Sequence, residues 1–297
     1  MWKRSSLLLL IPCLAIVIGL LTLPSREHEP QYKGQPLSHW VLLSQRAVQF
    51  DEADKAISEI GTNALPLLIK WIRYEPPPWR GKLANATLPM IQRLVQQFVP
   101  TKREVLASAS RYAFRRLGTN ATASIPELTR LMRNTSAPQT AVRAMGALSE
   151  IGTNGLAPLI SAIQDPKYPL RSWAVVTIAF MPATPTSATI TAPVLIQCLS
   201  DTTDPRIPPL AAMGLGKNTS APLLAIPALT RGLAAAGTGE ELLCAIIQSL
   251  GLFGSQATNA LPALTNALMD SSFMVRFAAT NAIEKITSKV SASTPAL

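Results

Sequence analysis

The sequence predicts an all-α protein, a right-handed α-solenoid of about six helix pairs with one further apolar helix at its N-terminus. Three observations predict this fold. A short phrase, plainest at residues 61–69, returns with variations along the chain, and its last five prolines are separated by 32, 35, 34 and 35 residues. Apolar residues follow each proline at the spacing of one helical face. Such regularity is typical of solenoids, in which each unit buries its apolar face against its neighbours. The prolines are Pro66, Pro126, Pro158, Pro193, Pro227 and Pro262.

Each phrase joins the end of one helix to the start of the next. Glycines stand just past the apolar runs, where a helix can end in a left-handed residue that glycine adopts without steric cost. Asn63 and Asn259 offer side-chain oxygens as N-caps. The proline then falls in the first helical turn, where the amide that it lacks needs no partner. The glycines are Gly61, Gly118, Gly152, Gly216 and Gly254.

A second helix completes each unit after a turn that carries an acidic residue, then an arginine, then small residues. The acidic and basic residues are Asp165, Arg171, Asp201, Arg206, Asp270 and Arg276. This pattern resembles the HEAT repeat family, including its bacterial PBS-lyase-like variety, over residues 37–288. The resemblance implies an armadillo-type superhelix in which aspartates and arginines of successive units form a structural ladder along the inter-helix turns. These six residues are the expected ladder members.

Composition narrows the classes of function. The chain has 297 residues, of which 48% are hydrophobic and only 15% are charged, so it can bury a large core. Two histidines and three cysteines leave little material for metal or nucleophile chemistry. Cys198 occupies an apolar stripe position and Cys244 aligns with small core residues, so both are expected as core thiols without a disulfide.

Residues 1–23 read as a membrane segment. A basic lead with Lys3 and Arg4 precedes an uncharged apolar run at residues 7–23, which is 17 residues long. This run just spans a bilayer core, and no small-residue cleavage site follows it, which favours an uncleaved single-pass anchor. A cleaved signal peptide, with a secreted product, is the alternative. The two basic residues keep the N-terminus cytoplasmic and send the repeats to the extracytoplasmic, periplasmic side.

The polar, proline-punctuated residues 24–36 predict a stalk. Within it, His28 and Glu29 resemble the metal-binding dipeptides of some HEAT-like hydroxylases. Those proteins use several such pairs on helices, whereas here the only other histidine is His39. We therefore expect no metal site.

The repeat spacing breaks between Pro66 and Pro126, which are 60 residues apart. The surplus, an irregular basic insertion at residues 74–101, contains a proline run at 76–78 that favours polyproline conformation, and a further helix is expected at 83–98. The proline run is predicted to be either an insertion loop or a segment that a peptide-binding module recognises.

Basic side chains concentrate around this insertion. Residues 70–116 hold ten basic and two acidic residues, a net of +8 out of the +10 of the whole chain. Arg111 and Arg115 share a helix face opposite Leu106, so we expect them to be exposed. Two interpretations of the cluster are open. It is either a solvated face or a binding site for anionic lipids, acidic proteins, polyanionic polymers or nucleic acid. The candidate surface comprises Arg80, Lys82, Lys102, Arg103, Arg111, Arg115 and Arg116.

From residue 119 onward the array is regular. An extended inter-helix loop is expected at residues 184–189, a last helix at 273–286 and a C-terminal tail at 289–297.

The sequence contains no paired-histidine metal motif, phosphate-binding glycine loop or nucleophile elbow. Two enzyme families use this type of scaffold and remain minor alternatives. Bilin lyases work with soluble cytoplasmic partners, which the anchor contradicts. HEAT-like DNA glycosylases use a basic concave face with an acidic residue and aromatics, and aromatics here are only 5%.

We therefore expect a membrane-tethered, non-catalytic scaffold or adaptor without cofactor or metal, which holds an unknown protein partner of the cell envelope. Nucleic acid is not expected as its ligand. The alternative is electrostatic binding of a polyanion or an anionic membrane surface through residues 70–116.

Overall fold

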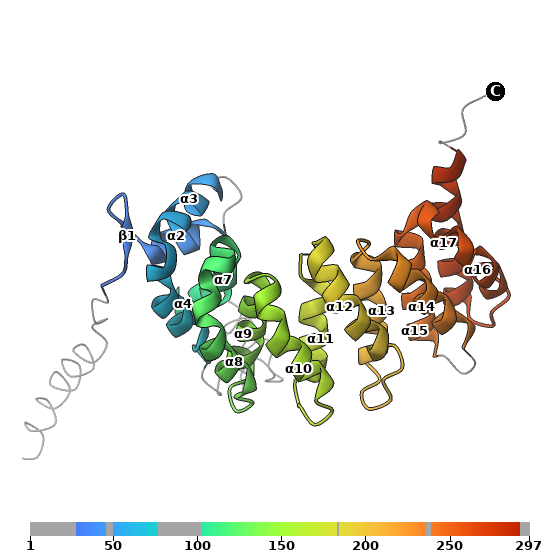
Figure 1. The fold of residues 1–297 in the computed structure, drawn as a ribbon, viewed down its shortest axis with the longest axis horizontal. Coiled ribbons are helices and arrows are strands. Elements are labelled where there is room, and N and C mark those ends of the chain that lie inside the picture. The colour runs from blue at the N-terminus through green and yellow to red at the C-terminus, as the bar shows by residue number, and fades with distance from the viewer. Residues whose placement is uncertain (1–27, 46–49, 77–101, 183, 236–238, 292–297) are drawn as a thin grey trace, which may run out of the picture.

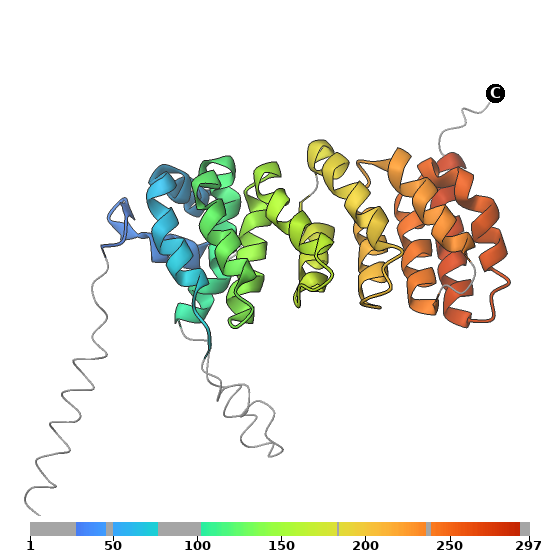
Figure 2. The ribbon, with the colours of Figure 1, turned by 60° about the horizontal axis from the view of Figure 1, so that its bottom comes forward.

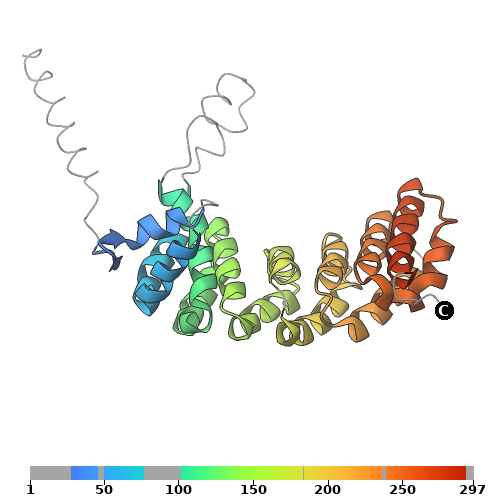
Figure 3. The same ribbon diagram turned by 90° about the horizontal axis from the view of Figure 1, so that it is seen from above.

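The computed structural model describes residues 28–45, 50–76, 102–182, 184–235 and 239–291. Within these ranges the chain is mostly helical, and its helices stand side by side along one long axis (Figures 1 and 2). Seen along the helices, the array forms an arc with one row of helices on the convex side and one on the concave side (Figure 3). The described residues thus form a helical solenoid, as the repeat period predicts.

The two rows make helix pairs. The outer row consists of α4 (Leu65–Ile72), α8 (Ile125–Arg133), α10 (Leu156–Gln164), α12 (Pro185–Cys198), α14 (Pro222–Ala234) and α16 (Leu261–Ala267). The inner row consists of α7 (Lys102–Leu117), α9 (Pro138–Glu150), α11 (Arg171–Phe180), α13 (Ile207–Lys217), α15 (Glu240–Leu252) and α17 (Phe273–Ser291). Two helices precede this series, α2 (Leu37–Leu43) and α3 (Phe50–Ile60). The core lies between the rows, where Leu128, Met145 and Leu159 are fully buried.

Short 3-10 helices precede several outer helices, and the recurring phrase forms them. They are η1 (Gly61–Ala64), η2 (Gly118–Ser124), η3 (Thr153–Gly155) and η4 (Gly254–Ala260). The expected asparagine N-caps are therefore wrong, because neither α4 nor α16 has a side-chain cap. Backbone carbonyls of the 3-10 turn serve instead, as when the amide of Leu65 donates to Thr62. Pro66, Pro126 and Pro262 lie in the first turn of their helices, as predicted.

Two outer helices begin earlier than their prolines predict. Pro193 and Pro227 lie inside α12 and α14. The expected loop at residues 184–189 is wrong, because Thr184 is the N-cap of α12 and forms a capping box with Ser187. Pro193 costs this helix a hydrogen bond. The cost is tolerated because the buried stripe of Ala188, Ala192 and Leu195 runs continuously past the proline.

Four of the five predicted helix-ending glycines have positive φ: 60° at Gly61, 50° at Gly118, 84° at Gly152 and 56° at Gly254. Gly216 contradicts the prediction, since it lies inside α13. A Cβ there would lie 2.6 Å from the Cα of Ser249 on α15, so this glycine permits close helix packing.

A β-hairpin lies within residues 24–36, where a stalk was expected. Strands β1 (Gln31–Tyr32) and β2 (Gln35–Pro36) form an antiparallel hairpin. Its turn residues Lys33 and Gly34 both have positive φ, as a tight two-residue hairpin requires. At the other end, α17 continues to Ser291, beyond the expected start of the tail.

The segment expected to be a membrane anchor, residues 1–23, lies outside the described residues, as do residues 77–101 of the insertion and 292–297 of the tail. Among the helices that the structure describes, none has the length and apolarity to cross a bilayer.

Candidate functional site

A groove crosses the inner helices α7, α9 and α11. Its volume is about 360 Å³. The lining is largely apolar and comprises Ser108, Pro138, Gln139, Val142, Arg143, Leu170 and Trp173. Trp173 is 48% exposed, and its indole is the largest apolar group in the groove. Because an exposed tryptophan in an apolar groove gains much by burial, this surface is suited to bind another apolar group.

Arg143 is held in place on one wall of this groove. Its Nη1 donates to the carbonyl oxygen of Tyr74, and its Nη2 donates to Oε1 of Gln139 at 2.9 Å. Burial lowers the pKa of the Arg143 guanidinium from its ordinary value. The amide of Thr140 donates to the carboxylate of Glu75 at 2.5 Å, which ties the start of α9 to the end of the first repeat. The cation is therefore fixed beside the apolar surface and keeps part of its side chain in solvent.

A buried carboxylate lies at the opposite end of α9. The side chain of Glu150 is only 2% exposed, and it accepts hydrogen bonds from Nε of Arg111 at 2.7 Å and from Nε of Arg115 at 2.8 Å. Nη2 of Arg115 adds a third at 2.9 Å. Burial raises the pKa of the Glu150 carboxyl, but the bonds from Arg115 and Arg111 outweigh it, so the pKa lies below the ordinary value. The Arg111 side chain passes over Gly146, where a Cβ would lie 3.2 Å from its Cδ.

The expected basic surface is therefore largely paired with acids where the structure describes it. Arg116 bonds to Asp54 at 2.6 Å, and Arg111 and Arg115 share Glu150. Lys102 and Arg103 are exposed in the first turn of α7. Arg80 and Lys82 lie outside the described residues.

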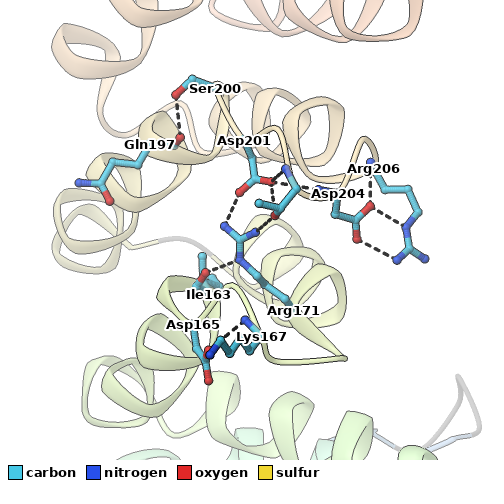
Figure 4. Close-up of polar contacts among 10 residues, drawn as sticks. Ile163, Asp165, Lys167, Arg171, Gln197, Ser200, Asp201, Asp204 and Arg206 are labelled. Atoms are coloured by element: carbon cyan, nitrogen blue, oxygen red, sulfur yellow. Dashed lines mark hydrogen bonds and ion pairs between the residues drawn. The ribbon is translucent and has the colours of Figure 1, made fainter.

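Further along the array, one expected ladder contact joins successive repeats. Arg171 at the start of α11 forms an ion pair with Asp201 after α12, and the two side chains are 14% and 8% exposed (Figure 4). Arg171 also donates to the carbonyl of Ile163 at 2.5 Å and to the hydroxyl of Thr203 at 2.7 Å. Burial alone would raise the pKa of Asp201, but the bond from Arg171 and those from residues 203–204 lower it to about 2.

The other expected ladder members bond within their own turns in the described part of the chain. Asp165 accepts from the amide of Lys167 at 3.0 Å, and Arg206 pairs with Asp204 at 2.8 Å (Figure 4). In the last repeat, Nη1 of Arg276 donates to the main-chain oxygen of Asp270 at 2.7 Å. These contacts shape single turns, whereas the Arg171–Asp201 pair connects two repeats.

Comparison with known proteins agrees with this repeat geometry. A family model described as "HEAT repeat" matches residues 260–290, the span that covers α16 and most of α17. The chain carries a HEAT repeat. No curated protein matches it. Among solved structures, human deoxyhypusine hydroxylase in complex with glycerol is similar at 13% identity and a TM-score of 0.37, over 78% of this chain and 98% of that one.

Across the residues that the structure describes, no group of three or more His, Cys, Asp or Glu side chains is placed to hold a metal ion. His28 is exposed, and Glu29 accepts a hydrogen bond from the amide of Ser38 at 2.8 Å in the first turn of α2. Cys198 and Cys244 are free thiols, and burial raises the pKa of Cys198 to about 11, so its thiolate is disfavoured.

Sequence reasoning missed Glu150 and Trp173. The signal for Glu150 was a lone acid at the end of the apolar run before Gly152, where an unpaired charge would be costly. Its partners lie 35 and 39 positions earlier, so only the packing of α7 on α9 identifies them.

Proposed function

We propose that this HEAT-repeat chain is a non-catalytic scaffold that holds a partner protein in the groove across α7, α9 and α11. The observation that carries the proposal is the half-exposed Trp173 in an apolar groove, with the fixed guanidinium of Arg143 beside it. Aromatic and arginine side chains of this kind supply much of the binding energy at protein interfaces.

The scaffold favours binding because the groove is formed in advance. Its walls come from three packed helices, and Arg143 is already positioned by Tyr74 and Gln139. Little conformational entropy is then lost when a partner binds. An apolar side chain of the partner would cover Trp173, and a carboxylate or carbonyl of the same segment would accept from Arg143.

We propose further that residues 7–23 anchor the chain in a membrane and that the repeats, wound as a right-handed superhelix, face the extracytoplasmic side. Secretion after signal cleavage is the alternative. Protease accessibility of a C-terminal tag in cells with the outer barrier opened tests this orientation. Digestion before the inner membrane is broken supports the proposal, whereas protection until that point contradicts it.

Electrostatic binding of a polyanion is the weaker candidate. Arg111, Arg115 and Arg116 already bond to Glu150 and Asp54, so little of their charge is available to a second anion. Binding of that kind would weaken steeply with rising salt, whereas binding at Trp173 would change little.

A photo-crosslinking amino acid at Ser108, an exposed position of the groove, tests the scaffold proposal in living cells. We expect a discrete protein adduct that is lost when Trp173→Glu is added. The same amino acid at Leu223, which is 89% exposed on the outer helix α14, is the matched control. The same adducts at both positions, or adducts at Ser108 that survive Trp173→Glu, would contradict the proposal.

A further inference from the structure

We infer that α17 binds a second copy of this chain through its exposed face, which carries Phe273, Phe277, Thr280 and Glu284. The inference is independent of the groove on α7, α9 and α11.

The packing of the inner row identifies this face. Each inner helix contacts its predecessor at one position and its successor two positions later. Ser249 of α15 faces back to α13, where its hydroxyl donates to the carbonyl of Ala212 at 2.8 Å and where it contacts Gly216. Gly251 of α15 faces forward, and a Cβ there would lie 3.1 Å from the Cα of Ala282 on α17. A step of two residues turns about 200° around a helix, so the two contacts use opposite faces.

The same register can be continued on α17. Ala282 is its backward contact, so Glu284 occupies the forward position that Gly216 and Gly251 occupy in α13 and α15. One and two helical turns earlier, Thr280 and Phe277 share this face. Gly216 and Gly251 are buried by the next inner helix, whereas the α17 residues are exposed.

The first half of this forward face is strongly apolar. Phe277 is 54% exposed, and Phe273, one turn earlier, is 67% exposed. Their rings stack at 6.1 Å between centroids. So much exposed aromatic surface on one helix end is a mark of an interface.

Charge placement favours a second copy as the occupant. The guanidinium of Arg276 lies 6.0 Å from the ring centroid of Phe273, and the exposed Glu284 lies on the same face two turns later. Arg276 and Glu284 are each four positions from Thr280, on opposite sides. Two antiparallel α17 helices that cross at Thr280 therefore bring Arg276 of each copy opposite Glu284 of the other. The face is thus complementary to itself, as a two-fold interface requires.

Cysteine cross-linking of the full-length chain tests the geometry. Thr280→Cys places a thiol on the two-fold axis, where it meets its own copy within disulfide range. We expect a disulfide-linked dimer on non-reducing gels after mild oxidation. Thr258→Cys, at an exposed position of η4, is the control and should give no disulfide-linked dimer on the gel, and neither should the parent chain with its native cysteines. Equal cross-linking of Thr280→Cys and Thr258→Cys would overturn the inference.

Analytical ultracentrifugation of the full-length chain tests the energetics. Reversing the charge in Glu284→Arg changes both symmetry-related pairs and should weaken dimerisation about tenfold. Phe277→Glu should weaken it by about 100-fold or more, because it removes a buried aromatic ring and leaves a carboxylate in the interface. Circular dichroism melts check that both variants stay folded, and their positions are exposed. A monomeric parent chain, or a dimer unaffected by either substitution, would overturn the inference.

Discussion

Replacement of Glu150 by glutamine should destabilise the N-terminal half of the array. The carboxylate is 2% exposed and accepts three hydrogen bonds from Arg111 and Arg115. Glutamine turns one acceptor oxygen into a donor that faces a guanidinium, and it weakens the remaining bonds because they lose the negative charge. A charge-assisted bond contributes about 1.5–3 kcal/mol and a neutral one about 0.5–1.5 kcal/mol. The arginines are 45% and 47% exposed and can bond to water instead, which limits the expected loss to about 2–3 kcal/mol.

The effect should depend on pH with a defined sign. The pKa of Glu150 is lower in the folded chain than its ordinary value of 4.5. A depressed carboxyl pKa stabilises the fold above the unfolded pKa, and this stabilisation is lost as the pH falls through the folded pKa. The difference in unfolding free energy between the parent chain and Glu150→Gln should therefore be largest above pH 4.5 and shrink in more acidic solution.

Urea unfolding of the purified full-length chain measures this difference, and hydrogen exchange locates it in α7 and α9. Glu127→Gln is the matched control, since that carboxylate also bonds to two arginines but is 31% exposed. The hydrogen bond from Arg130, aided by Arg73, lowers the pKa of Glu127 to about 2, yet an exposed pair contributes less than about 1 kcal/mol. Equal losses in both variants, or a pH-independent loss for Glu150→Gln, would refute the reasoning.

Two further substitutions probe the contacts between repeats. Gly216→Ala should destabilise the array by about 2 kcal/mol in thermal unfolding, because the new Cβ meets Ser249 at 2.5 Å and overpacking outweighs the gain in helix propensity. Gly239→Ala, with nothing within 4 Å of its Cβ, should stay within about 0.5 kcal/mol, and a similar loss at both glycines would argue against the close packing. Asp201→Asn should cost about 3 kcal/mol, since it leaves the buried Arg171 without its anion. The pKa of Asp201 is lowered from 3.8 to about 2, so the parent chain should be more stable than Asp201→Asn at pH 4 and lose this difference towards pH 2. Urea unfolding at the two pH values measures the difference, and a difference that does not change with pH would contradict the reasoning.

The errors in the sequence-based prediction have a common cause. The predictions at prolines and glycines rest on local conformational preferences alone. They are confirmed where the local preference and the packing agree, as at Pro66 and Gly152. At Pro193 the buried stripe on either side of the proline outweighed the lost hydrogen bond, so α12 begins at Pro185. At Gly216 a glycine is required because α15 packs closely against this position, and no local pattern reveals that contact.

The candidate sites show the same division. The basic cluster was visible in the sequence as composition, but Arg111, Arg115 and Arg116 form ion pairs with Glu150 and Asp54, which lie on other helices. Trp173 could be read as one more apolar residue of a helix until the packing of α7, α9 and α11 left it half-exposed in a groove.

By itself, the sequence determined that this protein is a stack of helix pairs with a HEAT-like period. Periodicity and turn chemistry act over a few residues, so they can be read along the chain. Only the tertiary structure decided which charges are neutralised, which glycines admit a neighbouring helix and which aromatic side chains stay exposed. These properties depend on contacts between residues 30 or more positions apart, and the free energy of such contacts is set by burial in the assembled array.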